Sequence, residues 1–141
     1  MRYNFMLDTK SQRFANKIES LSSITDFVHI FASRSKLDKN IESEINLLIE
    51  ELFTNQVKYN PKNPSVDIAL QKRENRIIIT FSHKQDSSFD PREVKADVKN
   101  LSLQERSAGG LGLQLVQAFA DAITYKFENN VSATIIVKHL E

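Results

Sequence analysis

Two pairs of alternating apolar stretches, each joined by a short polar turn, limit the folds open to this 141-residue chain. The first pair covers residues 66–70 and 77–81 around Glu74-Asn75, and the second covers residues 123–127 and 133–137 around Glu128-Asn129-Asn130. An apolar residue at every second position places one row of side chains on a single face of a strand. Each pair therefore predicts a β-hairpin. Consecutive hairpins produce a mainly antiparallel sheet, because tight turns join only antiparallel neighbours.

Two helical patterns precede the first hairpin. Apolar residues recur at helical spacing from Ser22 or Ser23 to Phe31, and serine is a suitable N-cap for such a helix. A second helix is predicted from about Ile41 to Tyr59. Its apolar face consists of Ile45, Leu48, Ile49, Leu52 and Phe53. The segment 60–64, which reads Asn-Pro-Lys-Asn-Pro, ends this helix, since proline cannot continue the hydrogen-bond ladder.

Weaker signals complete the order of elements. Alternation at residues 3–7 and 14–18 suggests strands, and residues 111–121 form a further helical pattern. Asp90 begins a compact helix start whose capping box is closed by Glu93, and the polar stretch 95–108 predicts a loop or lid. The resulting order predicts an α+β fold, a two-layer α/β sandwich with a mixed, mainly antiparallel sheet and helices on one face. The length fits a single domain, 1–141.

The composition excludes several classes of function. The 19 basic and 18 acidic residues give a net charge of +1, so nothing indicates binding to nucleic acid or to an anionic membrane surface. The apolar runs are too short to span a bilayer, and the first residues lack the apolar stretch of a signal peptide. Cysteine is absent, which excludes disulfides, thiolate metal sites and cysteine nucleophiles. We therefore expect a cytoplasmic protein.

Glu51 and Asn55 form the first candidate functional pair. Residues four apart lie on the same side of a helix, and this pair lies at the edge of the apolar face of the second predicted helix. An asparagine amide oxygen suits a hard cation, and a carboxylate can orient or deprotonate a nucleophile. Such pairs are also common on solvated helix surfaces, so the pair alone does not establish a site.

The second candidate is the cluster of Gly109, Gly110 and Gly112, which contains all three glycines of the chain. Glycine lets backbone N–H groups approach phosphate oxygens without interference from a Cβ atom. The helix predicted after the cluster presents the positive end of its dipole to the same anion. A turn that leads into a helix without binding any ligand is the alternative.

Together these segments resemble the GHKL ATPase superfamily (the Bergerat fold), and within it the small anti-sigma-factor serine/threonine kinases of bacterial partner-switching systems. The resemblance is carried by Glu51-Leu52-Phe53-Thr54-Asn55, similar to the N-box; by Phe89-Asp90-Pro91, similar to the segment after the second motif; and by Gly109-Gly110-Leu111-Gly112-Leu113, similar to the glycine-rich lid motif. Thr134 matches a threonine that lies by the adenine. The similarity extends from about Asn16 to His139.

The resemblance implies a role for each matched residue. Asn55 would coordinate Mg²⁺, and Glu51 would be the general base for a serine hydroxyl or a water. The phosphates of ATP would be surrounded by Gly109, Gly110, Leu111 and Gly112, with Lys58 nearby, and Thr134 would support the adenine. The family further implies that the chain binds a sigma factor and phosphorylates a small antagonist protein on serine or threonine. Homodimerisation is a further expectation from the family.

One motif departs from the family pattern. The family carries an Asp-x-Gly motif whose aspartate accepts a hydrogen bond from the adenine amino group. A count without gaps back from Phe89 places Lys84 at that aspartate, and lysine has no acceptor. If two residues are deleted from the loop, Asp86 takes the place of the aspartate and Ser88 that of the glycine. A plain loop aspartate is the other interpretation of Asp86.

Three functional interpretations follow. The first is an ATP-dependent protein kinase and anti-sigma factor, which Glu51, Asn55 and the glycine cluster favour. The second is a catalytically weak or inactive module of the same fold that regulates a partner by contact, which Lys84 favours. The third is the detached ATP-binding domain of a sensor histidine kinase, but no phosphoacceptor histidine on a dimerisation helix is apparent. The three histidines, His29, His83 and His139, are scattered and are interpreted as structural.

Overall fold

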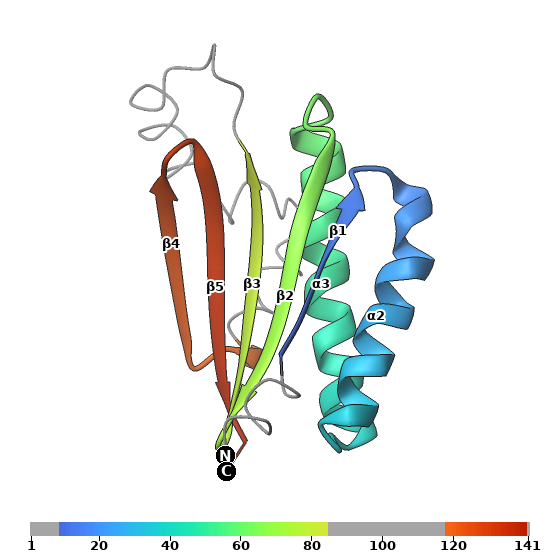
Figure 1. Ribbon diagram of the computed structural model, residues 1–141, viewed down its shortest axis with the longest axis vertical. Coiled ribbons are helices and arrows are strands. Elements are labelled where there is room, and N and C mark those ends of the chain that lie inside the picture. The colour runs from blue at the N-terminus through green and yellow to red at the C-terminus, as the bar shows by residue number, and fades with distance from the viewer. Residues whose placement is uncertain (1–8, 85–117, 141) are drawn as a thin grey trace.

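The computed structural model describes residues 9–84 and 118–140 of the chain. These residues form one five-stranded sheet with two α-helices packed against it (Figure 1). The strands are β1 (Thr9–Ala15), β2 (Ser65–Arg73), β3 (Arg76–Lys84), β4 (Ala122–Glu128) and β5 (Val131–His139). Their order across the sheet is β1-β2-β3-β5-β4, and every neighbouring pair is antiparallel. The predicted fold class, an α+β sandwich with helices on one face, is confirmed.

Both predicted hairpins are present. Arg73 pairs with Arg76 and Glu128 pairs with Val131, so each turn consists of two residues. In the second turn, Asn129 and Asn130 have φ angles of 52° and 63°. A type I′ turn requires positive φ at both central residues, and asparagine tolerates this conformation better than most residues. The Asn-Asn turn therefore fixes the register between β4 and β5.

The first helix begins earlier than the sequence pattern predicted. A 3₁₀ turn, η1 (Ile18–Ser20), leads directly into α2 (Leu21–Arg34), so the N-cap is Ser20 rather than a residue at 22 or 23. Ser20 has helical dihedral angles, and its hydroxyl donates to the carbonyl of Ala15 at 2.7 Å instead of capping the helix. The expected serine cap was therefore wrong, because the preceding turn supplies a backbone that is already helical.

The second helix is α3 (Lys39–Tyr59), close to the predicted span. Asp38 is its N-cap, and the Asp38 carboxylate accepts a hydrogen bond of 2.9 Å from the backbone N–H of Ile41. The helix ends at Tyr59, and its C-cap Asn60 directly precedes Pro61, as the proline-containing segment predicted. Glu51 and Asn55 therefore both lie within one continuous helix.

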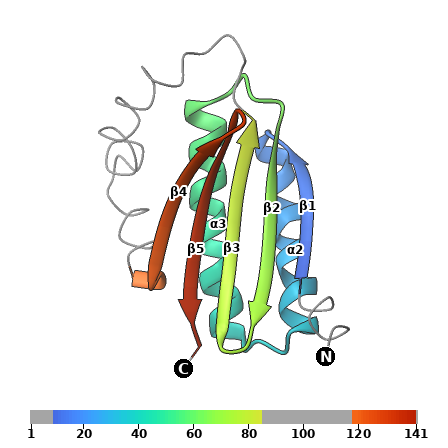
Figure 2. The ribbon, with the colours of Figure 1, turned by 60° about the vertical axis from the view of Figure 1, so that its left-hand side comes forward.

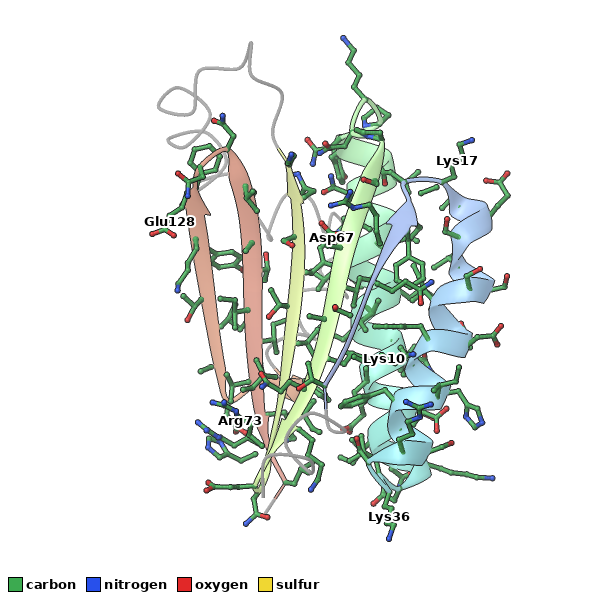
Figure 3. The ribbon with its side chains drawn as sticks, viewed as in Figure 1. Lys10, Lys17, Lys36, Asp67, Arg73 and Glu128 are labelled. Carbon is green, nitrogen blue, oxygen red and sulfur yellow. The ribbon has the colours of Figure 1, made fainter. Side chains whose placement is uncertain are left out.

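The helices and the sheet enclose one apolar core. Both helices lie on the same side of the sheet in two views (Figures 1 and 2). Phe14 of β1 packs edge-on against Phe27 of α2, with ring centroids 5.3 Å apart, and the Lys10 ammonium lies 5.6 Å from the same ring of Phe27 (Lys10 is labelled in Figure 3). The sheet contributes the buried residues Val66, Ile68, Leu70, Ile77, Ile79, Phe81 and Ile136. These are the alternating positions that predicted the hairpins.

The opposite face of the sheet carries a different set of side chains. Arg13 and Asp67 form an exposed ion pair of 2.9 Å across β1 and β2 on that face. None of the described helices covers it (Figure 2). Within the described ranges, no helix has the length and apolar character needed to cross a membrane.

Several predicted features lie outside the described residues. They are the strand at 3–7, the helix start at Asp90, the loop 95–108 and most of the helix 111–121. The described end of that helix is helical at Ala118 and Phe119. Asp121 is not helical, so the predicted helix end was slightly too late.

Candidate functional site

Helix α3 presents Glu51 and Asn55 at the boundary between the core and the solvent. Both side chains are half-buried, whereas Leu52, between them in the sequence, is buried in the core. The i, i+4 spacing places them one turn apart on the same side of the helix. The hydroxyl of Thr54 donates to the backbone carbonyl of Glu51 at 3.2 Å, so this contact uses the Glu51 backbone and not its carboxylate. The predicted position at the edge of the apolar face is thus confirmed.

The side chains of Glu51 and Asn55 have no partner within the part of the chain that the structure describes. Among the described residues, no hydrogen bond or ion pair engages the Glu51 carboxylate or the Asn55 amide. A half-buried carboxylate and amide are costly to leave without partners unless water or a ligand supplies them. Glu42 of the same helix differs, because its carboxylate contacts His29 at 2.9 Å.

Lys58 lies in the last turn of α3, three residues beyond Asn55. Its side chain is exposed, and the Lys58 ammonium lies 5.2 Å from the centroid of the neighbouring Tyr59 ring. A cation in the last turn is favoured by the helix dipole. The structure thus keeps Lys58 at the solvent boundary near Asn55, where an anionic ligand is accessible to it.

Thr134 lies in β5 and shares the helix-facing side of the sheet with Ile136, two residues along the strand. It is half-buried and pairs with Phe81 of β3 on one side and with Tyr125 of β4 on the other. Directly paired residues of antiparallel strands project to the same face. The fold therefore places Thr134 on the face of the sheet that carries α3.

Tyr125 is a candidate site residue that the sequence pattern did not identify. It pairs with Thr134, and 56% of its surface is exposed even though it is on the helix-facing side of the sheet. Desolvation raises the pKa of its hydroxyl. The alternation of Ile123, Tyr125 and Phe127 made it look like an ordinary strand residue. The signal that could have identified it is the register imposed by the two-residue turn at 129–130.

The remaining predicted site residues fall at or beyond the end of β3. Lys84 is the last residue of β3, is exposed, and pairs with Val131. Asp86 and the glycine-cluster residues Gly109, Gly110, Leu111 and Gly112 lie outside the described residues. The described structure thus brings Glu51, Asn55 and Lys58 together on α3 and places Thr134 on the sheet face that the helix covers.

Each histidine has a neighbour in the fold. His29 contacts Glu42, His139 lies 3.2 Å from the Asp121 carboxylate, and the buried His83 lies 2.8 Å from the side-chain nitrogen of Asn63. Within the described ranges, no group of three or more histidine and acidic residues is arranged to hold a metal ion.

Comparison with solved structures supports the fold. A chain of the SiaB–SiaC complex from Pseudomonas aeruginosa superposes with a TM-score of 0.67 at 11% sequence identity, covering 97% of this chain and 94% of that chain. The structure of the RsbU and RsbW domains of Rv1364c from Mycobacterium tuberculosis gives a TM-score of 0.64 at 9% identity, covering 93% of this chain and 32% of that one. At such identities the similarity concerns the fold.

The sequence comparisons concern the family. No curated protein sequence matches the chain. The family described as histidine kinase-like ATPase domain matches residues 14–138, which include the N-box segment, the glycine cluster and Thr134. Membership of a family of ATPase domains implies ATP binding, and the resemblance to the GHKL superfamily is confirmed. The chain therefore belongs to the histidine kinase-like ATPase domain family.

Proposed function

We propose that this chain binds ATP together with Mg²⁺ and acts as a protein-serine/threonine kinase and anti-sigma factor in a partner-switching system. The observation that carries the proposal is the half-buried pair Glu51 and Asn55 on α3, whose side chains have no partner among the described residues. A carboxylate beside an amide fits a catalytic base beside a metal ligand. Both residues lie within the segment, residues 14–138, that matches the ATPase-domain family.

The donor set fits Mg²⁺ in this role. Mg²⁺ prefers oxygen ligands and usually retains waters and substrate phosphates in its coordination shell, so a single amide oxygen from the protein is sufficient. When bound, the ion would neutralise charge on the phosphates. Asn55 would hold it, and Lys58 would add positive charge at the edge of the site. This arrangement needs no cluster of acidic residues.

The protein's part in the phosphoryl transfer would consist mainly of positioning and proton removal. Glu51 would accept the proton of the serine or threonine hydroxyl of the substrate protein as that oxygen attacks the phosphate. Gly109, Gly110, Leu111 and Gly112 would surround the phosphates through backbone N–H groups. Thr134 would support the adenine, with Asp86 as the acceptor for its amino group if the loop is shortened by two residues.

The partners follow from the same family resemblance. We propose a sigma factor as the bound regulator, a small antagonist protein as the substrate, and a homodimer as the assembly. The match to a chain of the SiaB–SiaC complex supports a protein partner, because that structure contains two proteins. We further propose that residues 1–141 form one ATP-binding domain that works in the cytoplasm and needs neither nucleic acid nor a membrane.

Calorimetric titration with ATP, with and without Mg²⁺, tests this proposal. We expect the wild-type protein to bind ATP only with the divalent ion and Asn55→Ala to abolish that binding. Asn46→Ala is a matched control, because it removes the same amide from the same helix nine residues earlier. Wild-type protein that releases no heat with millimolar ATP and Mg²⁺ would rule out the kinase.

Such a negative titration would favour the second candidate, a module that regulates its partner by contact alone. The observation that favours this candidate is Lys84, the last residue of β3. Counted back from Phe89 without gaps, Lys84 stands at the position of the family's adenine-binding aspartate. A lysine ammonium carries only donors, and the adenine amino group is also a donor. This candidate predicts that the chain binds its partner protein equally well in the presence and absence of ATP.

A further inference from the structure

The C-terminal end of α3 is tied to the strand β1 by one buried side chain. Asn16, which directly follows β1, is only 7% exposed. Its side-chain amide donates two hydrogen bonds, one to the carbonyl of Asn60 at 3.0 Å and one to the carbonyl of Asn63 at 2.9 Å. Its backbone N–H donates to the carbonyl of Pro64 at 3.0 Å. One residue therefore holds three carbonyls of the segment that leaves the helix.

This attachment continues into the helix. The Asn60 side-chain amide donates to the Gln56 side-chain oxygen at 3.2 Å, and the Asn60 backbone N–H donates to the Gln56 carbonyl at 2.9 Å. Gln56 is 5% exposed and is adjacent in sequence to Asn55. The chain of contacts thus runs from Asn16 through Asn60 to the residue next to the proposed metal ligand.

The same segment also contacts the end of β3. The side-chain nitrogen of Asn63 lies 2.8 Å from Nδ1 of His83, which is 8% exposed. His83 immediately precedes Lys84 at the end of β3. The C-terminal ends of β1, β3 and α3 lie at the same end of the molecule in both views (Figures 1 and 2), and Lys17, just after β1, is labelled there in Figure 3.

The carbonyls just beyond a helix end need such a partner. They have none in the hydrogen-bond ladder of the helix, and buried carbonyls must be satisfied elsewhere. Asn60 is the C-cap of α3, with φ of −131° and ψ of 56°, and Asn63 lies three residues beyond it, so both carbonyls lie outside the helix ladder. Asn16 offers two donors on one planar amide, which fixes both carbonyls relative to β1.

We infer that Asn16 is a positioning residue for the metal-binding end of the site: through Asn60 and Gln56 it fixes the turn of α3 that carries Asn55. The inference rests on the proposed role of Asn55 as the Mg²⁺ ligand. A metal ligand must be held in a narrow geometry by groups behind it, and loss of such supporting groups weakens metal binding by about 10–100-fold. Asn16 supplies that support from outside the site.

The test compares the gain in ATP affinity that Mg²⁺ produces in wild-type protein, Asn16→Ala and Asn16→Leu. The leucine variant keeps the branched side-chain shape, with the same number of heavy atoms, but lacks the two donors, so it separates hydrogen bonding from packing. Both variants should reduce the Mg²⁺-dependent gain by about tenfold. Ile24→Val, a conservative change in the buried core of α2, is the control for general destabilisation and should leave the gain unchanged.

The inference is overturned if Asn16→Ala and Asn16→Leu lower the thermal midpoint like Ile24→Val and leave the Mg²⁺-dependent gain at its wild-type value. Asn16 would then be a structural residue only. If Asn16→Ala does not fold, Asn60→Ala is the second variant, since it removes the side-chain contact with Gln56 and keeps the carbonyl that Asn16 binds. It should reduce the same gain by a smaller factor, about two- to threefold, and an unchanged gain would again overturn the inference.

A second measurement without nucleotide separates this inference from the proposed function. Hydrogen exchange of the backbone amides at 56–60 should become faster in Asn16→Ala, while amides near the start of α3 keep their wild-type rates. Wild-type protein without any Mg²⁺-dependent gain would refute the proposed function. Unchanged exchange at 56–60 in the variant would refute the attachment itself, whatever the result with ATP.

Discussion

Glu51 and Glu50 are adjacent on α3 but differ in environment, since Glu51 is half-buried and Glu50 is exposed. As the proposed base, Glu51 acts in the transition state. Glu51→Ala should therefore lower phosphoryl transfer by about 10²–10⁴-fold and leave ATP affinity close to wild type. Single-turnover transfer to an accepted partner protein measures the effect, with Glu50→Ala as the control on the same helix. Equal rates in Glu51→Ala and wild type would show that the carboxylate is structural.

Lys84 and Asp86 are alternative occupants of the adenine-binding position. If Asp86 accepts from the adenine amino group, Asp86→Ala should weaken ATP binding by about 1.5–3 kcal/mol, the range for a hydrogen bond to a charged group. Lys84→Ala should then have little effect. If Lys84 occupies the position, ATP should bind weakly or without preference over other nucleoside triphosphates, and Lys84→Asp should strengthen binding. Tight, adenine-selective binding that survives Asp86→Ala would contradict both alternatives.

The length of α3 depends on its N-cap. The Asp38 carboxylate accepts the N–H of Ile41 and lies at the positive end of the helix dipole. Asp38→Ala should lower the free energy of unfolding by about 1 kcal/mol. Urea denaturation measures it, and Asp26→Ala, an exposed carboxylate within α2, is the control. Equal stability of the two variants would show that the cap contributes nothing to α3.

The hairpin formed by β4 and β5 is held at its base by Asp121. The backbone N–H of His139 donates to the Asp121 carboxylate, and this hydrogen bond lowers the pKa of Asp121 below its usual value of 3.8. A carboxylate whose pKa is lower in the folded protein stabilises the fold above its unfolded pKa, and that contribution disappears as the pH falls through the folded pKa. Asp121→Asn should therefore lower the thermal midpoint at about pH 7, and the difference from wild type should shrink towards about pH 3. A difference that does not change with pH would contradict this assignment.

For the molecule as a whole, a ligand that binds only the folded state must raise its stability. At an ATP concentration of 100 times Kd, with Mg²⁺ present, the expected gain is about 2.7 kcal/mol. For a chain of this length the gain corresponds to about 5–10 °C in the thermal midpoint. Chelation of the divalent ion should reverse the shift, and Asn55→Ala should not show it. An unchanged wild-type midpoint would argue for the contact module instead of the kinase.

The sequence correctly predicted those strands and helix ends at which the local residues alone restrict the backbone conformation. The period-two alternation of β2 and β3 leaves one face for the core, and a slip of one residue would expose every apolar side chain. Pro61 ends α3 because its ring excludes a further helical turn. The start of α2 was predicted too late, since Ser22 and Ser23 resemble caps locally and only the preceding 3₁₀ turn moves the helix start to Leu21.

For the candidate site, the sequence determined which side chains share a face of α3, because helical geometry fixes the angle between Glu51 and Asn55 whatever surrounds them. It also predicted both hairpins, because strands that alternate around a short polar turn pair with each other, and the register of the structure limits each turn to two residues. Only the tertiary structure joined Asn16 to Asn60, a contact between residues 44 positions apart. Such contacts depend on how the chain closes long loops around its core, and no local periodicity encodes that closure.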